Sequence, residues 1–112
     1  MHGQDASRLL RGLGYAHVNE ADVGYGYVAD VYLPTVCTKS TPRGSVLELD
    51  GPFHFDNYSF ASLGPTVLKR RHLSNMGYGV ISLPFWEYHI SMSTVEKERA
   101  LLRSIEKVHS AE

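Results

Sequence analysis

The chain has 112 residues, of which 43% are hydrophobic and 21% charged, so it can form one domain with a hydrophobic core and does not have a disordered composition. The 11 Lys and Arg against 12 Asp and Glu exclude a strongly basic nucleic-acid binder at the level of the whole chain, so any contact with nucleic acid must depend on local charge. A single cysteine, Cys37, excludes an internal disulfide, and no apolar run approaches the ~18 residues that a membrane span needs.

The first half of the chain predicts a short helix followed by three strands. Gly14 is placed to end the helix, and Asp5 is atypical of a transit peptide, so we expect no targeting segment here. Alternating β-branched and aromatic residues predict the second strand, which Pro34 stops. The expected elements are a helix over about 5–13, a weak polar edge strand over 15–22, and strands over 27–33 and 45–50, with a loop at 35–44.

The second half predicts an ordered aromatic loop over the sheet, then a helix, a strand and a second helix. Pro65 suits the first turn of a helix and Gly77 its C-terminal cap. Ser93 and Glu96 form a capping-box pattern before the last helix, where Arg99 and Arg103 have ion-pair spacings to glutamates. We expect the loop at 53–64, an apolar helical stripe of Val67, Leu68, His72, Leu73 and Met76, and a strand at 78–83. The order α-β-β-β-α-β-α predicts an α/β or α+β sheet flanked by helices.

Three acidic residues lie on two of the predicted strands: Asp30 on 27–33, and Glu48 and Asp50 on 45–50. Side chains alternate along a strand, so Glu48 and Asp50 share a face, and Asp30 lies opposite one of them if the two strands pair. Converging carboxylates need a divalent cation such as Mg²⁺ or Mn²⁺, basic side chains or protons to neutralise them. The alternative is that Glu48 and Asp50 face solvent on a half-exposed strand.

His54 lies between two phenylalanines directly after the acidic strand end. A histidine there can bind phosphate as a cation, ligate a metal, or act as an acid or base. The alternative is a partly buried histidine that is hydrogen-bonded to the backbone.

The basic run Lys69-Arg70-Arg71-His72 is the dense basic patch of this nearly neutral chain. On a helix these residues cannot all face one way, but Lys69 and His72 are i,i+3 neighbours that can point together. Such a run is usually a solvated helical face. Aromatic residues that can stack on bases are plentiful, although most must serve the core.

Five motifs, in order and spacing, resemble those of a RAP domain, an RNA-binding domain abundant in apicomplexans and found in organellar RNA-processing proteins. They are YVADVYLP at 27–34, VLELDGPFHF at 46–55, LKRRHL at 68–73, GYGVI at 77–81 and LPFWEY at 83–88. The resemblance makes residues 1–112 a single RAP-like domain with a core over about 9–109. It implies a restriction-endonuclease-like fold, related to the very-short-patch-repair nucleases, with a mixed sheet flanked by helices.

The resemblance implies an RNA-binding module that acts in organellar RNA processing or stability, in a mitochondrion or plastid. RNA is then the expected partner, with other RNA-processing proteins as further partners and no membrane. The residues expected to contact nucleic acid are His54, Tyr58, Lys69, Arg70, Arg71, His72 and Trp86.

The related nucleases carry an aspartate on one strand, then an acidic residue, a spacer and a lysine on the next. Asp30 and Glu48 match, whereas Asp50 stands at the lysine position, from which Lys69 on the helix is a candidate replacement. One alternative function is therefore a Mg²⁺- or Mn²⁺-dependent nuclease that uses Asp30, Glu48 and Asp50 as ligands. A second is a protein-interaction domain without catalysis. A carboxylate cannot supply the charge stabilisation of the missing lysine, so we expect RNA to be bound and left uncut.

Overall fold

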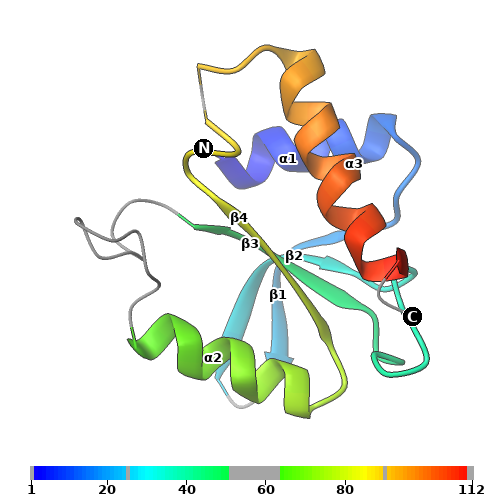
Figure 1. The fold of residues 1–112 in the computed structure, drawn as a ribbon, viewed down its shortest axis with the longest axis vertical. Helices are drawn as coiled ribbons and strands as arrows, with labels where there is room; N and C mark the ends of the chain where they lie inside the picture. Colours follow the sequence, from blue (N-terminus) through cyan, green and yellow to red (C-terminus); the bar gives the residue numbers. More distant parts are fainter. Residues whose placement is uncertain (1, 25, 51–63, 90, 111–112) are drawn as a thin grey trace.

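A computed structural model describes residues 2–24, 26–50, 64–89 and 91–110 of the chain. A four-stranded mixed sheet with three helices makes up the fold, which confirms the mixed α/β class (Figure 1). None of the helices in the described part combines the length and the apolar character that a membrane span requires. The elements in chain order are α1 (His2–Gly12), β1 (Val18–Gly24), β2 (Tyr27–Leu33), β3 (Ser45–Asp50), α2 (Gly64–Asn75), β4 (Gly79–Pro84) and α3 (Thr94–Ser110).

The sheet has the strand order β1-β2-β3-β4, so β1 and β4 are its edges. The first two pairings are antiparallel, and β3 pairs with β4 in parallel. Parallel neighbours need a crossover connection, and α2 lies within the one between β3 and β4. The described β2–β3 register ends at the pair Val31 and Leu47, one residue before the acidic positions.

Helices cover both faces of the sheet, with α1 and α3 on one face and α2 on the other (Figure 1). Adjacent residues of β3 show the division, because Leu47 packs with α1 and α3 whereas Val46 packs with Leu73 of α2. The larger core includes Leu10, Leu101 and Ile105, which have no exposed surface. Glu48 is two residues beyond Val46 and therefore lies on the α2 face.

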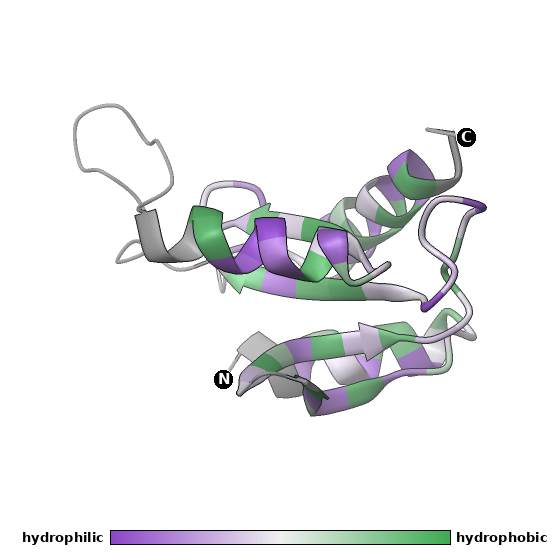
Figure 2. Cartoon of the chain, turned by 90° about the horizontal axis from the view of Figure 1, so that it is seen from below, coloured by the Kyte–Doolittle hydropathy of each residue, from purple (hydrophilic) through white to green (hydrophobic). Residues whose placement is uncertain are grey.

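The expected apolar stripe of α2 is only partly correct. Leu73 is fully buried, but Val67 and Leu68 are 39% and 48% exposed. Lys69 and Arg70 are instead partly buried, and Figure 2 shows hydrophilic residues along the middle of this helix. The spacing of the apolar residues was misleading, because α2 packs on the sheet with apolar side chains only in its C-terminal half. The rest of the helix approaches the sheet with basic side chains.

Two of the predicted element boundaries depend on local hydrogen bonds. Gly77 caps α2 at φ +96°, where the Tyr78 amide donates to the Leu73 carbonyl at 3.1 Å, as expected for a helix that ends at a glycine. The predicted start of β1 at Tyr15 is wrong, because the strand begins at Val18. His17 is instead held by Ser7 and by the Tyr15 carbonyl, which fixes the turn after α1.

Candidate functional site

The acidic residues of β2 and β3 meet where the ladder between these strands ends. Continuing the register by one residue sets Asp30 opposite Glu48, on the face covered by α2. Oδ2 of Asp30 accepts a hydrogen bond of 2.8 Å from the amide of Leu49. The Asp30 carboxylate therefore takes a backbone donor of β3 and ties the two strands together beyond their last described backbone pair.

Glu48 is a buried carboxyl group with a cation beside it. The residue is 7% exposed, and Oε1 lies 2.9 Å from Nζ of Lys69. The alternative that Glu48 faces solvent is therefore wrong.

Burial raises the pKa of Glu48 to about 7, from an ordinary value of 4.5. The ammonium of Lys69 opposes this change, whereas the negative charge of Asp30 adds to it. A carboxyl group with a pKa near neutrality can gain or release a proton at physiological pH, which is the property of a general acid or base. A divalent cation would favour the ionised form and lower this pKa again.

Lys69 connects the carboxyl group to a second element. Its Nζ also donates a 2.8 Å hydrogen bond to the carbonyl oxygen of Val28, so one ammonium group links α2 to both β2 and β3. A divalent cation, a basic side chain or a proton could neutralise these carboxylates. The structure places a basic side chain, that of Lys69, beside Glu48. Within the described ranges, no group of three His, Cys, Asp or Glu side chains is arranged to hold a metal ion.

The rest of the basic run also contacts the protein itself. His72 Nδ1 lies 2.6 Å from the Tyr27 hydroxyl, so His72 and Lys69 both reach the start of β2. Arg70 points to the other side and donates to Ser82 Oγ of β4 at 3.1 Å. Arg71 is exposed. Three of the four residues of the basic run therefore have contacts within the protein.

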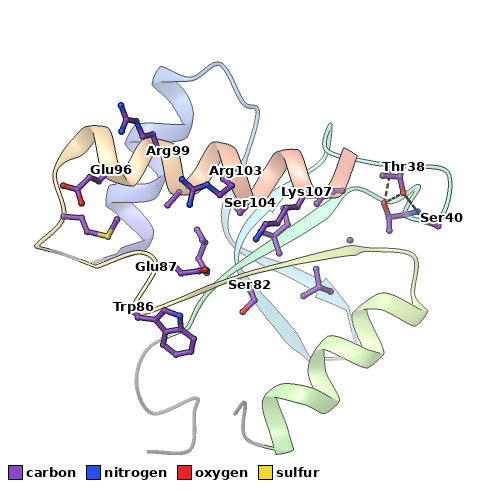
Figure 3. A pocket seen from close by; sticks show the side chains of 18 residues that line it. Thr38, Ser40, Ser82, Trp86, Glu87, Glu96, Arg99, Arg103, Ser104 and Lys107 are labelled. Carbon is purple, nitrogen blue, oxygen red and sulfur yellow. Dashed lines mark hydrogen bonds between the residues drawn. The ribbon is translucent and has the colours of Figure 1, made fainter. Parts of the chain in front are cut away.

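Trp86 lies away from this cluster, at a groove between β4 and α3 (Figure 3). The groove has a volume of about 670 Å³, and Trp86 at its border is 49% exposed. Three basic residues of α3 also line the groove: Arg99, Arg103 and Lys107. They are not among the predicted site residues, because the sequence indicates ion pairs with glutamates for Arg99 and Arg103. Their spacing of four residues, which puts them along one side of a helix, was the available signal.

Three further predicted site residues are not placed. His54 and Tyr58 lie outside the described residues, as do residues 53–63 of the expected loop, and the side chain of Asp50 is not described. Gly64, the last residue of that predicted loop, is the first residue of α2. Of the predicted site residues, the structure brings together Asp30, Glu48 and Lys69. Trp86 is separate from them.

The comparisons with known proteins agree with the motifs. Residues 47–104, about half of the chain, match the RAP domain family. The human protein "FAST kinase domain-containing protein 3, mitochondrial" is 32% identical over 73 residues, which cover 65% of this chain and 11% of that protein. No solved structure matches the chain. The matched segment includes Glu48, Lys69 and Trp86, and the chain belongs to the RAP domain family.

Proposed function

We propose that this chain is an RNA-binding domain that acts in organellar RNA processing or stability. Membership of the RAP domain family is the observation that carries this proposal. The surface of the described residues is compatible with it, because exposed arginines and a half-exposed tryptophan are available on a chain whose net charge is only -1. Arginine contacts to phosphate and aromatic stacking on bases are the usual means of binding single-stranded RNA.

The test is a binding titration with labelled single-stranded RNA at several salt concentrations, with DNA of the same sequence as a comparison. The proposal expects saturable RNA binding whose logarithm of affinity falls linearly with the logarithm of salt concentration, by ~0.7 for each phosphate contact. A folded protein that does not bind RNA at low salt would contradict it.

The location is proposed from the human relative, whose name describes it as mitochondrial. A mitochondrion is therefore favoured over a plastid, and other RNA-processing proteins remain the expected protein partners. Imaging the tagged full-length protein together with a mitochondrial marker tests the location, and a signal confined to the cytosol would contradict it.

A metal-dependent nuclease of the restriction-endonuclease-like fold is the second candidate, and the meeting of Asp30, Glu48 and Lys69 favours it. Carboxylate oxygens are the ligands that a hard cation takes, and Asp30, Glu48 and Asp50 would supply them. The cation would contribute charge stabilisation at a phosphate. Lys69 would complete such a site from α2, in place of the strand lysine.

Incubation of RNA with the protein in Mg²⁺ or Mn²⁺ separates the two candidates. We expect intact RNA, because Asp50 occupies the position of the strand lysine and the Lys69 ammonium already lies against Glu48. Cleavage products that disappear in Glu48→Ala, with RNA binding retained, would instead establish the nuclease.

A further inference from the structure

The groove between β4 and α3 is not used by the carboxylate cluster. Its sides are α3, the outer edge of β4 and the loop at 38–41 (Figure 3). Among the described residues, β4 pairs with β3 along one side only and is an edge of the sheet. An extended chain can therefore enter alongside this strand without displacing any described element.

A row of positive charge follows one side of the groove. Arg99, Arg103 and Lys107 are separated by four residues, so they advance ~6 Å along the helix and ~40° around it at each step. Arg99 and Arg103 are exposed, and all three line the groove. A regular row of cations is complementary to a polymer with regularly spaced negative charges.

The lining also contains two glutamates, Glu87 and Glu96. The Glu96 carboxylate accepts a 3.1 Å hydrogen bond from the Ser93 hydroxyl. The backbone amide of Glu96 donates a hydrogen bond to the oxygen of the same hydroxyl, so Glu96 is held at the N-terminal cap of α3. Glu87 is the other acidic side chain among the lining residues that the structure describes. The balance in the groove is therefore positive, with the excess along the middle and C-terminal part of α3.

The remaining lining includes groups that contact nucleic acid in other ways. Thr38, Ser40 and Ser82 also line the groove, and their hydroxyl groups are of the kind that donates to phosphate oxygens. In the structure the Thr38 and Ser40 hydroxyls lie 3.1 Å apart, and the Ser82 hydroxyl accepts a hydrogen bond from Arg70. Trp86 is half exposed and meets Phe85 edge to face, at 5.1 Å between ring centres. An aromatic ring held in this way offers a stacking surface for a base.

We propose that the groove between β4 and α3 holds single-stranded RNA, with phosphates along Arg99, Arg103 and Lys107 and a base stacked on Trp86. The proposal rests on the proposed RNA-binding function and gives it a site. It places the phosphate contacts on α3 rather than on the basic run of α2, because Lys69, Arg70 and His72 contact the protein itself.

The experiment compares two pairs of arginines that carry the same charge. Arg99→Gln/Arg103→Gln changes the groove, and Arg8→Gln/Arg11→Gln removes two exposed arginines from α1 that do not line it. Binding of a labelled oligouridylate is measured against salt concentration for both folded variants. The groove variant should lower the salt slope by ~1.4, at ~0.7 for each lost contact, and the α1 variant should leave it unchanged.

A separate variant tests the stacking surface. Trp86→Leu should weaken binding about tenfold and leave the salt slope unchanged, since a stacked base contributes ~1–3 kcal/mol and no counterion is released. If both arginine pairs give the same slope, or Trp86→Leu binds as tightly as the wild type, the groove is not the RNA site although the proposed function stands. If the folded wild-type protein binds no RNA, the proposed function itself fails. Competition by polyaspartate as effective as by RNA would assign the groove to an acidic polypeptide and overturn the RNA assignment.

Discussion

Two basic regions of this domain, the run at 69–72 in α2 and the row of Arg99, Arg103 and Lys107 in α3, have opposite relations to the rest of the molecule. The run is dense in the sequence, but three of its four residues contact β2, β3 or β4. The row is dispersed in the sequence and follows a groove at the surface. Consecutive charged residues on a helix point in different directions, whereas charged residues four positions apart lie along one side of the helix.

The largest expected effect is on stability, at Lys69. Lys69→Gln should lower the free energy of unfolding by roughly 3 kcal/mol at pH 8, because the buried Glu48 must then stay ionised without its cation or take up a proton from a basic solution. The loss should be smaller at pH 5, where Glu48, with its pKa of about 7, is protonated. Urea unfolding at both pH values measures the difference. Arg103→Gln is the control and should stay within ~0.5 kcal/mol of the wild type. An equal loss in both variants would mean that the two basic regions do not differ as described.

The second effect has the opposite sign, at Glu48. Its pKa is raised from 4.5 to about 7 on folding, so its contribution to stability is present below pH 4.5 and is lost as the pH rises through 7. Glu48→Gln cannot ionise and should therefore raise the free energy of unfolding at pH 8 by roughly 3 kcal/mol, given ~1.4 kcal/mol for each pKa unit. The two proteins should converge below pH 5. Glu20→Gln on exposed β1 is the matched control, and a Glu48→Gln effect that does not vary with pH would contradict the assignment.

The third effect concerns the hydrogen bond that closes the strand ladder. Asp30→Ala should cost roughly 1 to 2 kcal/mol, because the Leu49 amide loses its acceptor. Asp30→Asn keeps an acceptor oxygen and should cost less. It should also lower the pKa of Glu48, since the Asp30 charge raises it. Chemical denaturation measures the costs and an NMR titration the pKa. Equal costs for both substitutions would show that the hydrogen bond contributes nothing.

The smallest effects are on RNA binding by single arginines. Arg103→Gln should lower the salt slope by ~0.7, and Arg71→Gln, on the exposed side of α2, should leave it unchanged. Neither change should alter stability by more than ~0.5 kcal/mol. A slope that responds to Arg71 and not to Arg103 would move the RNA site from α3 to α2.

The strands and the acidic pair were accessible from the sequence for a simple reason. Alternation along 27–33 and 45–50 fixes which side chains share a face, and antiparallel pairing then sets Asp30 near Glu48. The boundaries of β2 and β3 match those predicted. The membership of the RAP family followed from motif order, and the match over residues 47–104 confirms it.

The approach of Lys69 to Glu48 was not accessible in the same way. It depends on where α2 crosses the sheet, a long-range property that no local period encodes. For the same reason, the apolar residues Val67 and Leu68 predicted a buried side of this helix that is exposed in the structure. The α3 row was missed because glutamates at ion-pair spacing gave Arg99 and Arg103 an adequate local explanation, and the groove beside them exists only after β4 and α3 have packed.

The packing of α1 and α3 on one face of the sheet has a consequence for how the fold is reached. Asp5 of α1 accepts hydrogen bonds from Lys97 of α3 and from Tyr88, and it is 92 positions from Lys97 in the chain. Leu9 and Leu10 of α1 are buried in the same core as Leu101 and Ile105. During synthesis α1 therefore emerges long before α3 exists, and its apolar side is covered only in part, by the sheet, until α3 has left the ribosome. Closing so long a loop costs entropy before these contacts can offset it, so α1 is expected to dock late and the domain to fold only after nearly all of it has been synthesised.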